Sequence, residues 1–270
     1  MWDRFVLGAQ AWMSRGNRME EIMKRFCFLV AILLLLPMAG QAGSAKISKE
    51  TITSQGKKRA YYLFVPGTIK TSAPLLITLH GSGRNGLSLV ERWKDLASKE
   101  GFIVAGPDAQ DSQAWNTPAD GPELLRDLVE ELKARYPVNP RRVYLFGHSG
   151  GAVFALGISM FESRYFAATA IHAGAWRSAQ EFSLIDFARR KIPIALVVGD
   201  RDAFFPAAAV AATGNRLKEK GFDVAVTIIK GHDHNYYGQA GQINQELWSF
   251  LNKYELTEEP AYQEYQFPKK

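Results

Sequence analysis

The sequence contains very little cysteine. Its 270 residues include one, Cys27, which lies close to the N-terminus. A single cysteine cannot close a disulfide within the chain, and the paired cysteines of structural zinc sites are missing with it. The H-E-x-x-H pattern of zinc proteases is also missing. These absences predict a fold without disulfides and a site that uses no metal or other cofactor.

The sequence also lacks a dense cluster of one charge. Lys and Arg number 33 and Asp and Glu 27, which gives a formal net charge of +6. No run of basic residues is longer than three, as in Lys57-Lys58-Arg59, whereas nucleic-acid-binding domains concentrate such residues on one face. We therefore expect no nucleic-acid partner. The 47% of hydrophobic and 22% of charged residues argue against a disordered chain, a collagen-like fibre and a polytopic membrane protein.

One long apolar run stands near the N-terminus, at residues 26–36. It follows Lys24 and Arg25, and Pro37 and several small residues come after it. This is the layout of a secretory signal peptide, and the run is shorter than the ~20 residues of a membrane-spanning helix. An uncleaved membrane anchor is the alternative interpretation.

The expected processing follows from this layout. We expect residues 23–45 to be the signal peptide, with cleavage near Ala42 or Ala45, and residues 1–22 to be an upstream extension of the reading frame. Cleavage would leave a chain with no stable membrane span. The sequence thus predicts a secreted or periplasmic protein.

Strand and helix patterns alternate through residues 46–254, which we expect to form one α/β domain. Residues 48–54 and 60–65 read as an antiparallel hairpin. Continuous apolar runs then predict strands buried on both faces, at 75–79, 102–105, 143–146, 167–171, 194–198 and 224–229. Helical periodicity predicts helices between them, at about 87–99, 121–135, 150–162, 179–190, 207–220 and 241–254. This alternation predicts a mostly parallel, doubly wound sheet, followed by a loosely attached polar tail at 255–270.

The polar residues of interest follow the predicted strands. All five histidines of the chain stand at such strand ends, namely His80, His148, His172, His232 and His234. The carboxyl ends of strands in an open parallel sheet form its ligand crevice. We therefore expect the functional site at this edge of the sheet.

The sharpest motif is Gly147-His148-Ser149-Gly150-Gly151, which follows one predicted strand and opens a helix. This is the G-x-S-x-G nucleophile elbow in its required context, where the tight turn needs glycine at Gly147 and Gly151. It predicts Ser149 as a nucleophile and the Gly150 amide as one donor of an oxyanion hole.

A serine hydroxyl needs a base to take its proton and an acid to orient that base. The strand ends supply Asp200 or Asp202 as the acid and His232 or His234 as the base, in the chain order serine, acid, histidine. A metal site that uses some of these side chains is the rival chemistry.

Residues 46–254 resemble the α/β-hydrolase superfamily, in the small serine esterase branch of dienelactone-hydrolase-like and polyhydroxybutyrate-depolymerase-like enzymes. The stretch from Gly231 to Tyr237 is similar to the histidine loop of esterase D, or S-formylglutathione hydrolase, although Asn235 stands where Ser is usual. The resemblance implies an α/β-hydrolase fold, with His234 as the base and Asp202 as the acid. It also implies the Ser82 amide, in the loop His80-Gly81-Ser82-Gly83, as the second oxyanion donor.

The resemblance implies a serine carboxylesterase that acts on a small-molecule ester. The segment 173–190 is too short for a large lid, so we expect a small or extended substrate in an open cleft. Four aromatic residues on loops are candidates for the substrate pocket: Trp115, Trp176, Phe204 and Phe205. Acyl transfer through the same triad and an inactive binding protein on this fold remain alternative functions.

Overall fold

Two antiparallel strands open the part of the chain that this computed structural model describes, residues 46–263. Strand β1 (Ser48–Ser54) pairs with β2 (Lys57–Phe64) across the two-residue turn Gln55-Gly56. Both turn residues have positive φ, as the tight turn of a β-hairpin requires, and glycine adopts this conformation without strain. The predicted hairpin is confirmed. The expected signal peptide (23–45) and upstream extension (1–22) lie outside the described residues.

The hairpin joins a larger sheet through β4. The eight strands of the described chain lie in the order β1-β2-β4-β3-β5-β6-β7-β8, and all pairings from β4 to β8 are parallel. The remaining strands are β3 (Ala73–Leu79), β4 (Ile103–Pro107), β5 (Val138–His148), β6 (Ala168–His172), β7 (Ile194–Gly199) and β8 (Val224–Ile229). Every residue of β3, β4, β6 and β7 is buried, as their continuous apolar runs predict. The same prediction is wrong for β8, where only Val224 is buried, because β8 lies at the edge of the sheet.

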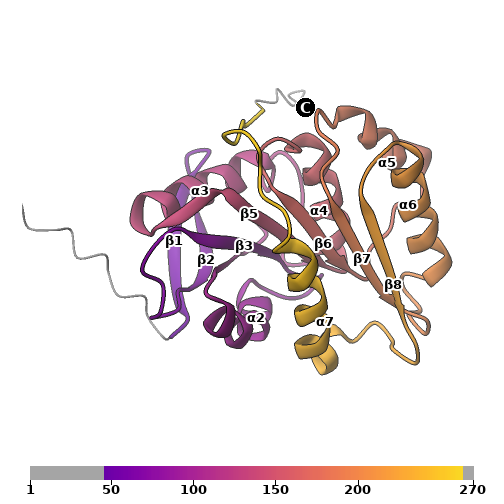
Figure 1. Cartoon of the computed structure of the whole chain (residues 1–270), viewed down its shortest axis with the longest axis horizontal. Coiled ribbons are helices and arrows are strands. Elements are labelled where there is room, and N and C mark those ends of the chain that lie inside the picture. Colours follow the sequence, from indigo (N-terminus) through magenta and orange to yellow (C-terminus); the bar gives the residue numbers. More distant parts are fainter. Residues whose placement is uncertain (1–45, 264–270) are drawn as a thin grey trace, which may run out of the picture. The chain divides into compact units, whose positions relative to one another are not determined.

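Helices cover both faces of this sheet (Figure 1). Helices α2 (Leu87–Glu100) and α7 (Tyr236–Leu251) lie on one face, and α3 (Pro122–Arg135), α4 (Gly150–Phe161) and α6 (Ala207–Glu219) lie on the other. The buried residues accordingly form two hydrophobic clusters, one for each face. This is the mostly parallel, doubly wound sheet of the α/β-hydrolase fold, as predicted.

Two helices differ from the sequence prediction. Helix α7 begins at Tyr236, five positions before the predicted start, and ends at Leu251. Gly238 and Gly241 weaken the helical pattern there, but the full burial of the Tyr236 side chain fixes the first turn. The segment predicted as one helix at 179–190 forms a short α5 (Ala179–Ser183) and a 3-10 turn, η1 (Leu184–Phe187). No large lid is inserted among the described residues between β6 and β7.

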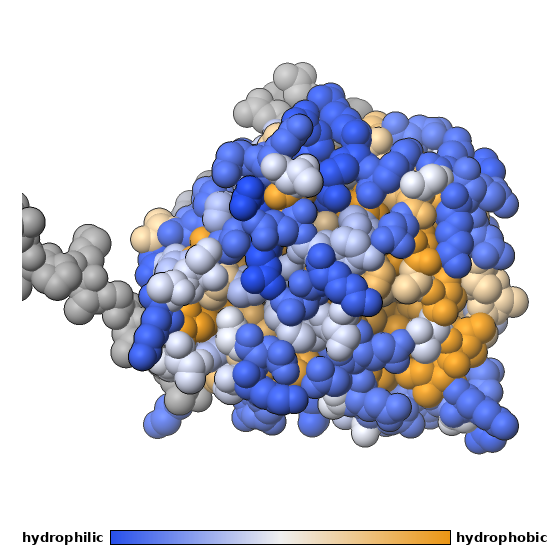
Figure 2. Space-filling model, viewed as in Figure 1, coloured by the Kyte–Doolittle hydropathy of each residue, from blue (hydrophilic) through white to orange (hydrophobic). Residues whose placement is uncertain are grey.

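The polar tail is attached more closely than expected over its described part. The Leu256 amide donates to the Arg141 carbonyl, the Ala261 amide donates to the Arg164 carbonyl, and Leu256 is buried. Figure 2 shows a largely hydrophilic face, with hydrophobic surface gathered on the β7–β8 side. Strand β8 is a sheet edge there and carries the exposed Ile228. Among the described helices, none is long and apolar enough to cross a membrane.

Candidate active site

Ser149 occupies a strained turn between β5 and α4. Its φ is 56° and its ψ is −121°, a conformation that non-glycine residues rarely adopt. The turn is closely packed, because a Cβ atom at Gly147 would lie 2.3 Å from the Gly151 carbonyl oxygen. A Cβ atom at Gly151 would lie 2.0 Å from the Leu79 carbonyl oxygen. Glycine is therefore required at both positions, and the turn presents the serine at the N-terminus of α4.

The side chains of Ser149, His234 and Asp202 form an unbroken hydrogen-bonded series. The Ser149 Oγ lies 2.9 Å from Nε2 of His234, and Nδ1 of His234 lies 2.8 Å from Oδ2 of Asp202. A carboxylate can only accept here, so Nδ1 carries the proton and Nε2 is free to accept from the serine hydroxyl. This tautomer suits His234 as a general base.

The structure separates the two aspartates that the sequence offered as the acid. The side chain of Asp202 is fully buried, and its Oδ1 accepts the amides of Phe204 and Phe205, each at 2.8 Å. Asp200 instead accepts the Gly231 amide at 2.7 Å. Of the two, Asp202 alone contacts His234 among the described residues, as the resemblance implied.

Two backbone amides lie beside the serine. A Cβ atom at Gly150 would lie 3.7 Å from the Ser82 backbone nitrogen, so the two predicted oxyanion donors are neighbours. Neither amide donates to an acceptor within residues 46–263. Two free N–H groups next to a nucleophile can stabilise the negative oxygen of a tetrahedral intermediate.

His80 fixes the loop that carries the Ser82 amide. Its Nδ1 lies 2.9 Å from the Gly81 carbonyl oxygen, and its Nε2 accepts the Ala109 amide at 3.1 Å. The proton must therefore sit on Nδ1, and a second proton on Nε2 would break the bond to Ala109. Burial lowers the pKa of His80, which keeps the ring in this neutral form.

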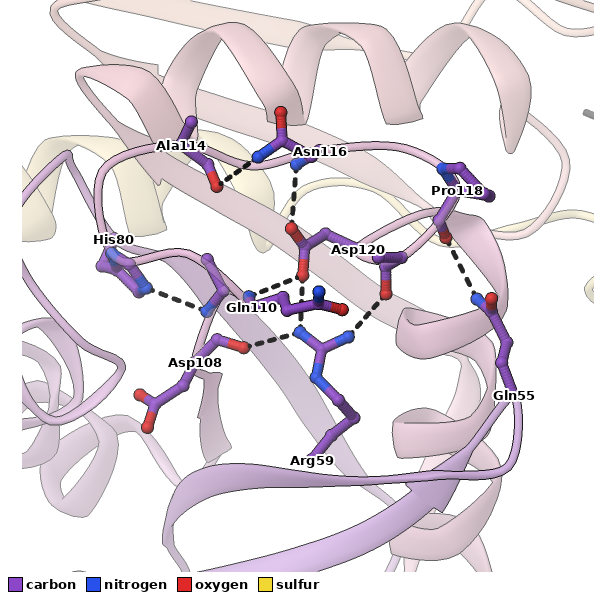
Figure 3. Close-up of polar contacts among 11 residues, drawn as sticks. Gln55, Arg59, His80, Asp108, Gln110, Ala114, Asn116, Pro118 and Asp120 are labelled. Atoms are coloured by element: carbon purple, nitrogen blue, oxygen red, sulfur yellow. Dashed lines mark hydrogen bonds and ion pairs between the residues drawn. The ribbon is translucent and has the colours of Figure 1, made fainter. Parts of the chain in front are cut away.

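The loop between β4 and α3 is organised around a buried ion pair (Figure 3). Arg59, on β2, donates to Oδ1 of Asp120 at 2.5 Å, and the Asp120 side chain is fully buried. Arg59 also donates to the Asp108 and Ala119 carbonyls. The remaining capacity of Asp120 accepts the amides of Gln110 and Asn116, at 2.9 and 2.8 Å. One charged pair thus holds both ends of this loop.

This loop in turn contacts residues 80–83, which carry the predicted oxyanion donor Ser82 and are called the oxyanion loop below. Besides the Ala109 contact, Nε1 of Trp115 donates to the His80 carbonyl at 2.8 Å, and the Gly83 amide donates to the Ser112 carbonyl at 2.8 Å. Trp115 stacks on Phe154 with ring centroids 5.0 Å apart. Trp115 thus links the oxyanion loop to helix α4, a structural role that the sequence did not indicate.

Three of the histidines form a buried row behind the triad. Nδ1 of His148 lies 3.1 Å from Nδ1 of His172, and Nε2 of His172 lies 2.9 Å from Nε2 of His232. The first two meet because β5 and β6 pair them in register. His232 reaches the row because its loop crosses Gly199, where a Cβ atom would lie 2.0 Å from the His232 carbonyl oxygen.

Two members of this row, His148 and His172, are held neutral. Burial, with a smaller contribution from the charges of neighbouring histidines, lowers the pKa of His148 to about 3 and that of His172 to about 2. The His148 ring lies 5.1 Å from that of His234 and, being neutral, adds no positive charge beside the base. No group of three or more metal-ligating side chains capable of holding an ion occurs among the described residues.

A cavity of about 330 Å³ opens directly at the serine. Its lining includes Ser149 and His234 together with Gly81, Ser82, Arg84, His148, Asp233, Asn235 and Tyr237. Of the four aromatic residues predicted for the pocket, none lines this cavity. Phe204 and Phe205 lie close to it against the His234 ring, with centroids 4.8 and 6.0 Å away. Trp176 differs from the expectation, because it is only 2% exposed and packs in the core against Phe182. Arg84 and Tyr237 are cavity residues that the sequence reasoning did not single out.

The fold is that of the α/β-hydrolases. Residues 54–250 match the protein-family model Esterase, described as "Putative esterase". The match covers most of the chain, and the protein belongs to this Esterase family.

Several known proteins are similar to this chain. It is 28% identical to the poly(3-hydroxyalkanoate) depolymerase C of Paucimonas lemoignei over 59% of the chain and 41% of that protein. It is 29% identical to a bifunctional acetylxylan esterase/xylanase of Neocallimastix patriciarum over 37% of the chain and 16% of that protein. The chain therefore matches less than half the length of these two relatives.

A solved structure shares the fold. The S-formylglutathione hydrolase from Agrobacterium tumefaciens superposes with a TM-score of 0.60 at 17% identity, over 78% of this chain and 95% of that one.

Proposed function

We propose that the protein is a serine carboxylesterase that hydrolyses small or extended esters through an acyl-enzyme. The observation that carries this proposal is the series from Ser149 through His234 to Asp202, with contacts of 2.9 and 2.8 Å. Membership of the Esterase family supports the reaction class. The two relatives named as a depolymerase and an acetylxylan esterase agree with an ester bond as the target.

In the first half of the reaction, the Ser149 Oγ attacks the ester carbonyl carbon. Nε2 of His234 takes the hydroxyl proton, and Asp202 stabilises the imidazolium that forms. The carbonyl oxygen becomes negative and accepts hydrogen bonds from the Ser82 and Gly150 amides. The bond to the alcohol oxygen then breaks, and that oxygen takes the proton from Nε2.

In the second half, water replaces the alcohol. Nε2 of His234 takes a proton from water as its oxygen attacks the acyl carbon. The bond between that carbon and the Ser149 Oγ breaks, and the serine oxygen regains a proton from His234. The free acid leaves, and the enzyme returns to its starting state.

The open cleft supports a small or extended substrate. The cavity at Ser149 is about 330 Å³ and has no inserted lid over it among residues 46–263. A buried chamber for a long-chain lipid would need such a cover, because apolar chains bind where water is excluded.

Turnover of p-nitrophenyl acetate by the wild type, Ser149→Ala and His234→Ala tests the proposal. Loss of the nucleophile or of the base should lower kcat by about six orders of magnitude, as in other serine triads. Circular dichroism and melting curves of the three proteins check that they are equally folded. Turnover by folded Ser149→Ala at the wild-type rate would contradict the proposal.

We also propose that the enzyme acts outside the cytoplasm, in the periplasm or the medium. The support is the arrangement of Lys24 and Arg25 before the apolar run 26–36, and the small residues after it. The intact mass of protein recovered from the extracytoplasmic fraction tests this. A mass that begins near residue 43 or 46 is expected, and an intact N-terminus on protein confined to the cytoplasm would contradict it.

A further inference from the structure

One cation lines the cavity at the serine. Arg84 follows the oxyanion loop, and its amide donates to the Gly81 carbonyl at 3.2 Å. This turn places the arginine two positions after Ser82 and on the same cavity wall. The Arg84 side chain is exposed, so it can meet a bound molecule without prior rearrangement of the core.

The guanidinium is held by an aromatic ring. The Cζ of Arg84 lies 4.8 Å from the centroid of Tyr237, which also lines the cavity and stands three positions after His234. A guanidinium in contact with an aromatic face keeps the N–H groups on its edges available. Within the part of the chain that the structure describes, the Arg84 side chain enters no ion pair and donates no hydrogen bond. Its fork of donors therefore has no partner within the described chain.

No carboxylate near the cavity is paired with Arg84. Asp233 lines it, but its Oδ1 accepts the Asn235 amide at 2.8 Å within its own loop. The Asp202 side chain is fully buried against His234. The Oδ1 of Asp108 accepts the Gly86 amide at 2.8 Å. None of the three forms an ion pair with Arg84, so its charge faces the cavity unpaired.

We propose that this enzyme prefers esters that carry a second, anionic group, a carboxylate, which the Arg84 guanidinium binds while Ser149 attacks the ester carbonyl. The inference rests on the proposed esterase function and names its substrate class. A planar guanidinium fits a carboxylate through two parallel hydrogen bonds, a geometry that a neutral ester does not offer. The anion can belong to the acid or to the alcohol of the ester, since both ends of the ester lie next to the serine.

Two matched substrate pairs test the inference. On the acid side, the mono-p-nitrophenyl ester of glutaric acid is compared with p-nitrophenyl pentanoate, which has the same chain length and no charge. On the alcohol side, para-acetoxybenzoate is compared with its methyl ester. The quantity measured is the ratio of kcat/KM for the anionic ester to that for the neutral ester, at low and at high salt.

The wild type should prefer the anionic member of at least one pair. Arg84→Gln should lower that ratio by about 10- to 100-fold, the range for one charged hydrogen-bonded contact, while it still hydrolyses the neutral ester. Arg84→Lys should retain part of the preference, because it keeps the charge and loses the planar fork. High salt should weaken the preference of the wild type.

Arg92→Gln is the matched control. Arg92 lies 5.9 Å from the same Tyr237 ring but does not line the cavity, so its loss should leave the ratio unchanged. A wild type that prefers neither anionic ester, or an Arg84→Gln variant with the wild-type ratio, would overturn the inference. Both results leave neutral esters hydrolysed through Ser149. Failure of the esterase function itself looks different, since no ester of either pair would then be turned over.

Discussion

Asp202 and Asp200 are two positions apart and do different work. Asp202 accepts a hydrogen bond from Nδ1 of His234 at 2.8 Å and is fixed by two backbone amides. Asp200 accepts the Gly231 amide and thereby ties the end of β7 to the histidine loop. The first contact concerns a proton that the reaction depends on, and the second concerns the shape of a loop.

The two aspartates should therefore respond differently to the same substitution. Asp202→Asn should lower kcat by about four orders of magnitude, because an amide favours the wrong histidine tautomer. Asp200→Asn keeps an oxygen acceptor for the Gly231 amide and should stay within a few-fold of the wild type. Kinetics on p-nitrophenyl acetate measure both, and an inactive Asp200→Asn beside an active Asp202→Asn would reverse the assignment of the acid.

The sequence predicted the individual residues of the site, which composition alone could not do. Ser149, Asp202 and His234 each follow a predicted strand, which pointed to one site, and the structure brings the three together. The residues could not choose between Asp200 and Asp202, because both follow the same strand. The resemblance made that choice. The burial of Trp176 was out of reach, since a tryptophan on a loop gives no sign of which way it faces.

At the scale of elements, the loop between β4 and α3 determines how firmly the oxyanion loop is held. It is fixed by Asp120 and Arg59, which are 61 positions apart in the chain. The Ala109 amide and the Trp115 side chain of this loop both donate to His80. These two bonds fix the position of the loop that carries the Ser82 amide. The ion pair is thus connected to the predicted oxyanion donor through two loops.

Asp120→Asn tests this support. It leaves the buried Arg59 without its counter-charge, and we expect a loss of about 3–5 kcal/mol in the free energy of unfolding. At temperatures where the variant is folded, kcat should fall by a larger factor than KM rises, because the oxyanion donors act mainly in the transition state. Asp111→Asn, the same substitution at an exposed site in the same loop, should affect neither quantity. Urea titration and steady-state kinetics measure both, and wild-type behaviour of Asp120→Asn would refute the role.

Sequence periodicity located the strands and most helices, but it could not foresee these loops. Apolar runs such as 194–198 reveal a buried strand because burial on both faces leaves no polar position. The Arg59–Asp120 pair carries no such pattern, since it depends on which distant segments become neighbours. The first turn of α7 was missed for a similar reason, because packing of Tyr236 outweighs the low helix propensity of the nearby glycines.

At the scale of the whole molecule, the buried histidine row links folding to pH. His148 and His172 have pKa values lowered by burial, whereas the same side chains in the unfolded chain titrate near 6.5. Below pH 6.5 the unfolded chain therefore binds protons that the folded protein does not. Acid must favour unfolding over this range, and the effect ends only near the lowered pKa values.

We expect the free energy of unfolding to fall as pH drops from about 6.5 toward 4, by about 1.4 kcal/mol per pH unit for each such histidine. His172→Asn removes one titrating ring and can keep a hydrogen bond to His148, so its dependence on pH should be shallower by about one proton. Urea titrations between pH 4 and 8 measure the two slopes. Equal slopes for the variant and the wild type would show that folding does not lower the pKa of His172.

The whole fold serves to bring separate strand ends to one edge of the sheet. Strands β3, β5, β7 and β8 are followed by the oxyanion loop, Ser149, Asp202 and His234 in turn. A chain that folds in this way should have an activated serine whatever its substrate, because the activation resides in the geometry of the triad.

Labelling with a fluorophosphonate probe detects such a serine, since the probe reacts with activated serines and needs no knowledge of the substrate. The purified protein should take up about one equivalent of probe, and mass spectrometry should place the adduct on Ser149. His234→Ala should take up almost none. No adduct on the folded wild-type protein, or an equal adduct on folded His234→Ala, would contradict the account.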